Sequence, residues 1–93
     1  MIDQTQADIV AVCEEVKELL LSKNRKYGNS ALEPVRIFSK ASASEAILVR
    51  MDDKLSRIVS DQSDDNEDAF LDLLGYLILW RVSKLQEGRE TAL

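Results

Sequence analysis

The sequence contains no histidine and only one cysteine, Cys13. Imidazole catalysis, imidazole metal ligation, an internal disulfide and a cysteine-based zinc site are therefore all excluded. Any metal ion would need hard oxygen ligands, which suit Mg²⁺. The sequence also lacks segments of alternating apolar and polar residues, the pattern typical of β-strands, so we expect an all-α fold.

Long hydrophobic runs are missing as well. The longest, AFLDLLGYLILW at 69–80, is interrupted by Asp72 and is shorter than the ~20 residues needed to cross a bilayer. The first ten residues lack the basic region followed by an apolar region that marks a secretory signal. We therefore expect no membrane partner, no export and a cytoplasmic location.

The chain has 93 residues, which is enough for one small core. We expect a single helical domain at 1–86 and a frayed tail at 87–93. The net charge of -5 argues against duplex nucleic acid as a partner. The charges are nevertheless unevenly distributed, because 23–57 contains eight cations and four acids, whereas 58–75 contains six acids and no cation.

Apolar residues at helical spacing predict three long-to-medium helices, at about 5–26, 43–59 and 67–86. The first should end near Tyr27, because a glycine follows it. The capping-box motif Ser30-Ala-Leu-Glu33 predicts one further short helix between the first and second.

The third helix is apolar over more than half of its circumference, so one neighbouring helix cannot cover it. The residues responsible are Phe70, Leu71, Leu73, Leu74, Leu77, Ile78 and Val82. Because this chain has too few helices to surround such an element, we expect a homo-oligomer, most simply a dimer, that completes a helical bundle.

Two positions at the end of the first helix continue its apolar stripe, namely Lys23 and Tyr27. A cation on that side needs an anionic partner, either a carboxylate of this protein or a ligand phosphate. Arg25 and Lys26 are more simply explained by the negative end of the helix dipole. Asn24, in the same segment, is included among the ligand-binding candidates.

A cationic stripe follows the second helix, at Arg50, Lys54 and Arg57. These side chains suit a phosphate site, since guanidinium groups match phosphate geometry. The alternative is a solvated flank in which Asp53 forms local ion pairs with both arginines.

Asp72 is the only charged residue at 69–80. A carboxylate inside a bundle must be paired or metal-bound, so it either pairs with Lys54 or Lys23 or binds a metal. Asp68 suits the positive end of the third helix. On the first helix, Glu14, Glu15 and Glu18 have the spacing of Mg²⁺ ligands, but the helical wheel places Glu14 and Glu18 nearly opposite the apolar stripe, which favours a solvated surface.

Three segments together carry a family resemblance: KNRKYGNS (23–30), RMDDKLSRI (50–58) and EDAFLDLLGY (67–76). With them, the chain resembles the first nucleotide-modification-associated domain family, small helical proteins of phages and bacteria. That family is similar in pattern to MazG-like and all-α dUTPase-type nucleotide pyrophosphatases. The resemblance implies Mg²⁺ as cofactor, and the host cytoplasm as location if the protein is phage-encoded.

The resemblance also implies roles for individual residues. Asp68 and Asp72 would be catalytic and would hold Mg²⁺ with two glutamates of the first helix. Three cations would bind the phosphates of the nucleotide. The glutamates are Glu15 and Glu18, and the cations are Lys23, Lys54 and Arg57.

We therefore expect a helical oligomer that binds a nucleotide or nucleotide-derived small molecule, with Tyr27 or Tyr76 stacked on the base. If it is an enzyme, it would be a Mg²⁺-dependent nucleoside triphosphate pyrophosphohydrolase. One alternative is a noncatalytic protein that sequesters a nucleotide signal and needs no cofactor. A second is a structural interaction module whose cations pair with Asp53, Asp68 and Asp72.

Overall fold

The computed structural model describes residues 3–33, 38–60 and 66–92, apart from the side chains of 66–68 and 90–92. It contains three helices, α1 (Gln4–Tyr27), α2 (Ala43–Ser60) and α3 (Asn66–Ala92), and the described residues include no strand. The expected all-α fold is confirmed. None of the described helices is long and apolar enough to span a membrane.

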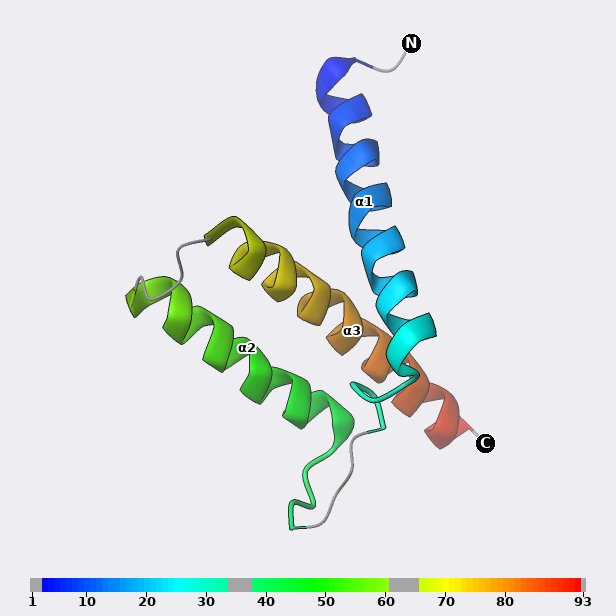
Figure 1. Ribbon diagram of the computed structural model, residues 1–93. Helices are drawn as coiled ribbons and strands as arrows, with labels where there is room; N and C mark the ends of the chain where they lie inside the picture. Colours follow the sequence, from blue (N-terminus) through cyan, green and yellow to red (C-terminus); the bar gives the residue numbers. More distant parts are fainter. Residues whose placement is uncertain (1–2, 34–37, 61–65, 93) are drawn as a thin grey trace.

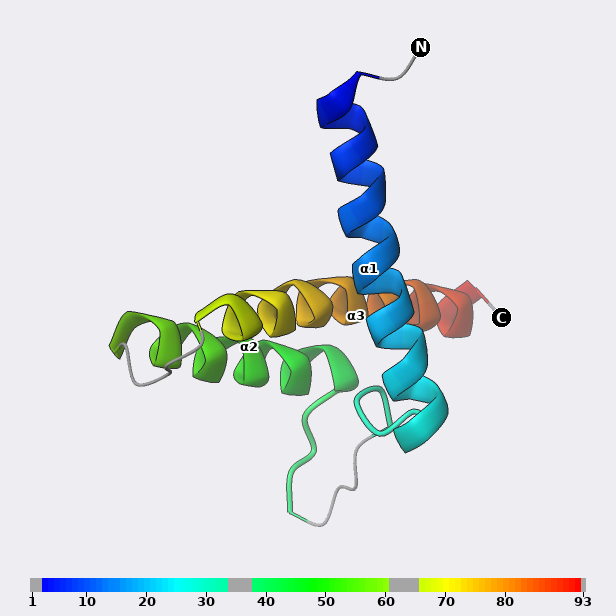
Figure 2. The ribbon, with the colours of Figure 1, turned by 45° about the horizontal axis from the view of Figure 1, so that its top comes forward.

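The helices pack as an antiparallel pair crossed by a third. Figure 1 shows α2 and α3 side by side and running in opposite directions, while α1 crosses α3. The C-terminal half of α1 lies against α3, and its N-terminal half projects past α3 on the side away from α2 (Figure 2). This arrangement leaves half of α1 without a neighbour among the described residues.

Both ends of α1 are fixed by local hydrogen bonds. The Asp3 carboxylate accepts from the Gln6 amide at 2.8 Å, as an N-cap does. At the other end, the Gly28 amide donates to the Asn24 carbonyl at 2.7 Å, and Gly28 has φ 67° and ψ -152°, a conformation almost restricted to glycine. The first helix therefore stops at Tyr27, as the sequence predicts.

The expected short helix is not found in the described part of the linker. Residues 28–33 form turns, in which the amides of Leu32 and Glu33 both donate to the Asn29 carbonyl, at 2.9 and 2.7 Å. The turn thus starts at Asn29, one residue before the capping motif, and Ser30 caps no helix there. Residues 34–37, where the rest of this helix was expected, lie outside the described residues.

The second capping motif does start a helix. The Ser42 hydroxyl accepts from the Glu45 amide at 3.2 Å, and α2 begins at Ala43. Its first turn is attached to α3, because the buried Ser44 hydroxyl donates to Glu87 Oε1 at 2.9 Å. Glu87 lies beyond the expected end of the third helix at Gln86, since α3 continues to Ala92.

The core of this single chain is small. Among the residues whose side chains are described, the buried apolar ones are Val16, Ile47 and Ala69, one from each helix, whereas many large apolar side chains on α1 and α3 are exposed. Burial of apolar surface within one chain is therefore incomplete.

Candidate functional site

A cavity of about 240 Å³ lies where the end of α1 meets the middle of α3. Four parts of the fold form it: the last turns of α1, the turn after Gly28, the middle of α3 and one side chain of α2. Its lining includes Lys23, Asn24, Tyr27, Arg50, Asp72 and Tyr76, together with apolar residues such as Leu20 and Leu79. Six candidates from the sequence therefore share one cavity.

The close approach of α1 to α3 depends on Gly75. A Cβ atom at this position would lie 3.2 Å from Leu20 Cδ2, closer than ordinary van der Waals contact. Val16, one turn before Leu20, is only 2% exposed. The glycine thus lets the apolar stripe of α1 pack directly on α3, which places Lys23 over the cavity.

Asp72 is the electrostatic centre of the site. Lys54 Nζ lies 3.1 Å from one of its carboxylate oxygens and Lys23 Nζ lies 3.6 Å from the other. The lysines come from α2 and α1, so the carboxylate joins two helices that lie on different sides of α3. The sequence-based alternative in which Asp72 pairs with lysine is observed, and both lysines that it named take part.

Arg50 adds positive charge to the same cavity. It lies on α2, is exposed, and forms no ion pair with any other residue that the structure describes. Arg50 and Lys23 line the cavity, and Lys54 pairs with Asp72, the one carboxylate in its described lining, so three cations accompany one carboxylate at this site. These four groups leave two positive charges uncompensated, so the site attracts anions.

The two tyrosines and Asn24 differ in what they can offer a ligand. Tyr27 is exposed, and Lys26 Nζ lies 5.2 Å from the centre of its ring. Tyr76 is half-buried on α3. The Asn24 side-chain amide donates to the Gly28 carbonyl at 3.2 Å and to Asn29 Oδ1 at 2.8 Å. Asn24 therefore holds the turn that lines the cavity.

Arg57 lies apart from the cavity. Its guanidinium is 3.4 Å from Asp53 Oδ2, one turn earlier on α2, and both side chains are largely exposed. Arg57 is not among the residues that line the cavity. Of the cationic stripe on α2, the structure brings Arg50 and Lys54 to the site, and Arg57 forms the local ion pair expected for a solvated flank.

The acidic residues of α1 also lie apart from Asp72. Glu15 and Glu18 are exposed. Glu14 pairs with Lys17 at 2.6 Å, and its hydrogen bond and charge, with a smaller contribution from Glu18, raise the pKa of Lys17. The pair is a surface feature of the helix.

The side chains expected to bind Mg²⁺ do not lie together, as far as the structure describes them. Among the described residues, no three acidic or cysteine side chains form a group that could hold a metal ion. The backbone of Asp68 belongs to the first turn of α3, but its side chain lies outside the described residues. A Mg²⁺ site that includes Asp68 stays a prediction.

Two features of the site were not recognised in the sequence. One is Gly75, whose place in the middle of an apolar helix could have signalled close helix contact. The other is the turn after Gly28, which forms one wall of the cavity through Asn29, Ser30 and Leu32. Its role depends on tertiary packing, for which the sequence carries no local signal.

Comparisons of the chain with models of protein families, with curated proteins and with solved structures find no match. The resemblance inferred from the three sequence segments stays a prediction.

Proposed function

We propose that the cavity between α1 and α3 binds a small phosphorylated molecule that carries an aromatic ring, such as a nucleotide. The observation behind this proposal is that Lys23 and Arg50 line the cavity, whose described lining includes one carboxylate, Asp72, and that this carboxylate also pairs with Lys54. Positive charge in excess at a partly apolar cavity favours a ligand with both an anionic and an apolar part. The resemblance to nucleotide-modification-associated proteins supports the same ligand class.

Arg50 and Lys23 are the groups available to a phosphate. Arg50 has no carboxylate partner among the described residues, and the Lys23 side chain is 54% exposed, whereas that of Lys54 is 19% exposed. A phosphate can therefore bind the guanidinium of Arg50 and draw Lys23 from Asp72, while Lys54 keeps the carboxylate paired. Tyr27 and Tyr76 line the same cavity and provide rings for stacking on a base.

The geometry favours binding without catalysis. Each oxygen of Asp72 faces an ammonium group, so a Mg²⁺ ion would have to displace a lysine in order to bind there. The noncatalytic alternative needs no such exchange. We propose that the ligand binds without metal and is released intact.

A panel of nucleoside triphosphates and cyclic nucleotides, each tested with Mg²⁺ and with EDTA, tests this function. A bound ligand raises the melting temperature, because it stabilises only the folded state. We expect such a rise in EDTA, without release of pyrophosphate. Pyrophosphate released only with Mg²⁺ would establish the hydrolase instead, and no effect of any compound would leave the structural module.

Two arginine variants give a matched comparison within this test. Arg50→Gln should weaken nucleotide binding by about tenfold or more, the usual cost of losing a charged hydrogen bond. Arg57→Gln removes the same charge from the same helix outside the cavity, so it should leave the affinity within about twofold of the wild type. Equal losses in both variants would mean that only general charge attraction was measured.

We also propose that the protein functions as a homo-oligomer. The support is the incomplete core of the single chain, since large apolar side chains of α1 and α3 remain exposed. Completion of a helical bundle by a second copy would bury them.

A further inference from the structure

Exposed apolar residues of the projecting half of α1 and of one face of α3 make up a surface that we call the apolar corner. Ile9, Val12 and Cys13 lie on the projecting half of α1, on the stripe that leads to the buried Val16. The other members follow the free face of α3. They are Phe70, Leu74, Leu77, Ile78 and Leu85.

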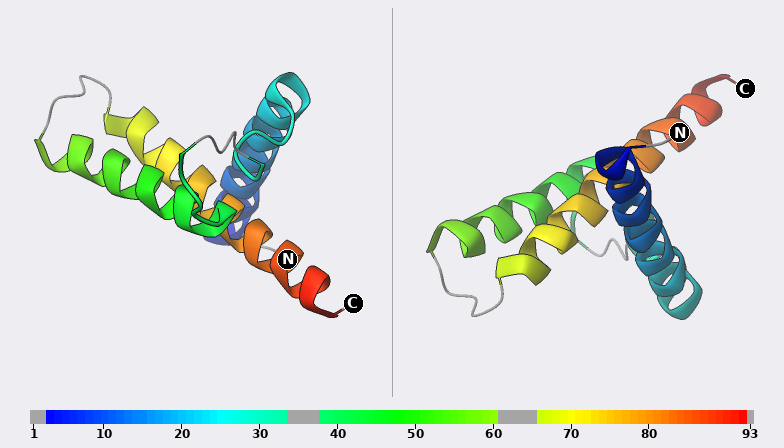
Figure 3. Two further views of the ribbon diagram at one scale, coloured as in Figure 1. Left: turned by 90° about the horizontal axis from the view of Figure 1, so that it is seen from below. Right: turned by 90° about the horizontal axis from the view of Figure 1, so that it is seen from above.

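This face of α3 is free because the other faces are occupied. Gly75 faces α1, and Ala69 and Ser83 are buried. At 100° per residue, Phe70, Leu74 and Leu77 lie together on a face that contains none of these. Figure 3 shows that α2 runs along one side of α3 and that α1 only crosses α3.

We infer that the apolar corner is covered by a second copy of this chain, with the projecting half of α1 of each subunit packed on the free face of α3 of the other. This inference rests on the proposed homo-oligomer and names its interface. The corner contains both a projecting helix and a face to receive one, so a two-fold axis satisfies both copies at once.

The dimensions of the two parts agree. The projecting segment 4–16 is about 20 Å long, and the free face from Phe70 to Leu85 is about 24 Å long, at 1.5 Å per residue. With Ile9 57% and Phe70 55% exposed, and the other large members 37–48% exposed, the corner offers on the order of 600 Å² of apolar surface per subunit. A standard stable interface buries about 800 Å² per partner, of which roughly 60% is apolar.

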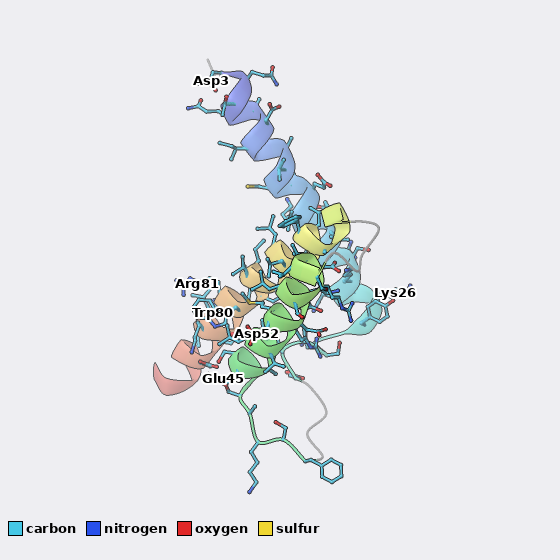
Figure 4. All side chains as sticks on the ribbon, turned by 90° about the vertical axis from the view of Figure 1, so that its left-hand side faces the viewer. Asp3, Lys26, Glu45, Asp52, Trp80 and Arg81 are labelled. Atoms are coloured by element: carbon cyan, nitrogen blue, oxygen red, sulfur yellow. The ribbon has the colours of Figure 1, made fainter. Side chains whose placement is uncertain are left out.

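The charges of the two parts are complementary. Residues 3–16 contain four acids and no cation. Arg81, by contrast, lies on the free face of α3, is exposed, and forms no ion pair with any described residue. Figure 4 shows Arg81 and Lys26 on opposite sides of the molecule, and Arg81 is not among the residues that line the cavity. An acidic α1 against Arg81 of a second copy brings opposite charges together in an otherwise acidic chain.

The molecular mass in solution tests this interface. Sedimentation equilibrium of the full chain at about 100 µM should give a dimer. Ile9→Glu and Leu77→Glu each place a charge in the interface and should weaken the dimer by at least about 100-fold. Val49→Glu is the matched control, because Val49 is a large exposed apolar residue of α2 outside the corner, and it should leave the dimer intact.

The Cys13 thiol reports on the same surface without any substitution. Its reaction with a disulfide reagent should be slow at concentrations where the dimer forms and fast in Leu77→Glu. Circular dichroism shows whether each variant keeps its helices, so unfolding is distinguished from dissociation. A monomeric wild-type chain would overturn the inference, and so would a dimer that survives both corner variants.

The nucleotide assay separates this inference from the proposed ligand. No residue of the corner is among those that line the cavity. A monomeric Leu77→Glu protein that still shows the nucleotide-dependent rise in melting temperature would support both proposals separately.

Discussion

Replacing Asp72 by asparagine should change fold stability and anion binding in opposite directions. In the wild type, the Asp72 carboxylate holds Lys54 at 3.1 Å and Lys23 at 3.6 Å. Asparagine keeps the size of the side chain and one oxygen acceptor but removes the charge. The variant therefore loses the link between α1, α2 and α3, while the lysines become available to a ligand.

The loss of stability can be estimated from the exposure of each pair. Exposed ion pairs contribute about 0.2–1 kcal/mol each. The Lys54 pair should lie at the upper end of this range, because the Lys54 side chain is only 19% exposed. We expect the free energy of unfolding to fall by about 1–2 kcal/mol, and each kcal/mol lowers the melting temperature of a domain of this size by roughly 4–8 °C.

The gain in anion affinity follows from the removed repulsion. A carboxylate ~5 Å from a phosphate charge costs about 3 kcal/mol at an effective dielectric constant of ~20. Salt and water reduce this cost, so we expect binding to become about tenfold tighter. Titration calorimetry with ATP and with pyrophosphate in EDTA measures the affinity, and urea denaturation measures the stability.

Asp53→Asn is the control, since Asp53 pairs with Arg57 on the exposed face of α2. It should change both quantities little, by less than about 0.5 kcal/mol. The reasoning fails if Asp72→Asn weakens the binding of both anions while the melting temperature stays unchanged. That result would mean that Asp72 contacts the ligand or its metal and does not restrain the lysines.

Four further substitutions test the packing of the helices and the turn that follows α1. In α3, Gly88→Ala should stabilise the fold by about 0.5–1 kcal/mol, because a Cβ there meets open space. Gly75→Ala should lose that gain, because its Cβ would lie 3.2 Å from Leu20. Chemical denaturation of the two variants measures the difference. Gly28→Ala should cost about 1–3 kcal/mol, because φ 67° with ψ -152° is strained for any side chain; an unchanged melting temperature would contradict the observed turn. Ile47→Ala, at 1% exposure the least exposed apolar residue described, should cost about 2–5 kcal/mol in urea denaturation.

The helices could be predicted from the sequence because their signals are local. The apolar spacing of α1 and the glycine after Tyr27 fixed its extent, and the Ser42 cap fixed the start of α2. The predicted short helix in the linker was wrong over 30–33, because a capping box specifies only one possible partner for free amides. The Asn29 carbonyl accepts the hydrogen bonds of the amides there, and nothing in the sequence ranks this partner against the Ser30 side chain.

The candidate site was predictable where a residue had to face inward. Lys23 continues the apolar stripe of α1, so it had to lie near α3, where Asp72 is the carboxylate within reach. Arg50 and Arg57 have equivalent positions in the sequence pattern, but only Arg50 reaches the cavity. Which of the two arginines reaches the cavity depends on the point at which α1 crosses α3. The contact at Gly75 determines that point, and a helical wheel cannot predict it.

The crossing at Gly75 also has a mechanical consequence. α1 rests on α3 through its C-terminal half alone, so the contact acts as a fulcrum and the N-terminal half as a lever about 20 Å long. A rotation of about 6° at the fulcrum moves the far tip by about 2 Å over that length. Any change in how Lys23 is held next to the fulcrum is thus amplified into displacement at Ile9, well away from the cavity.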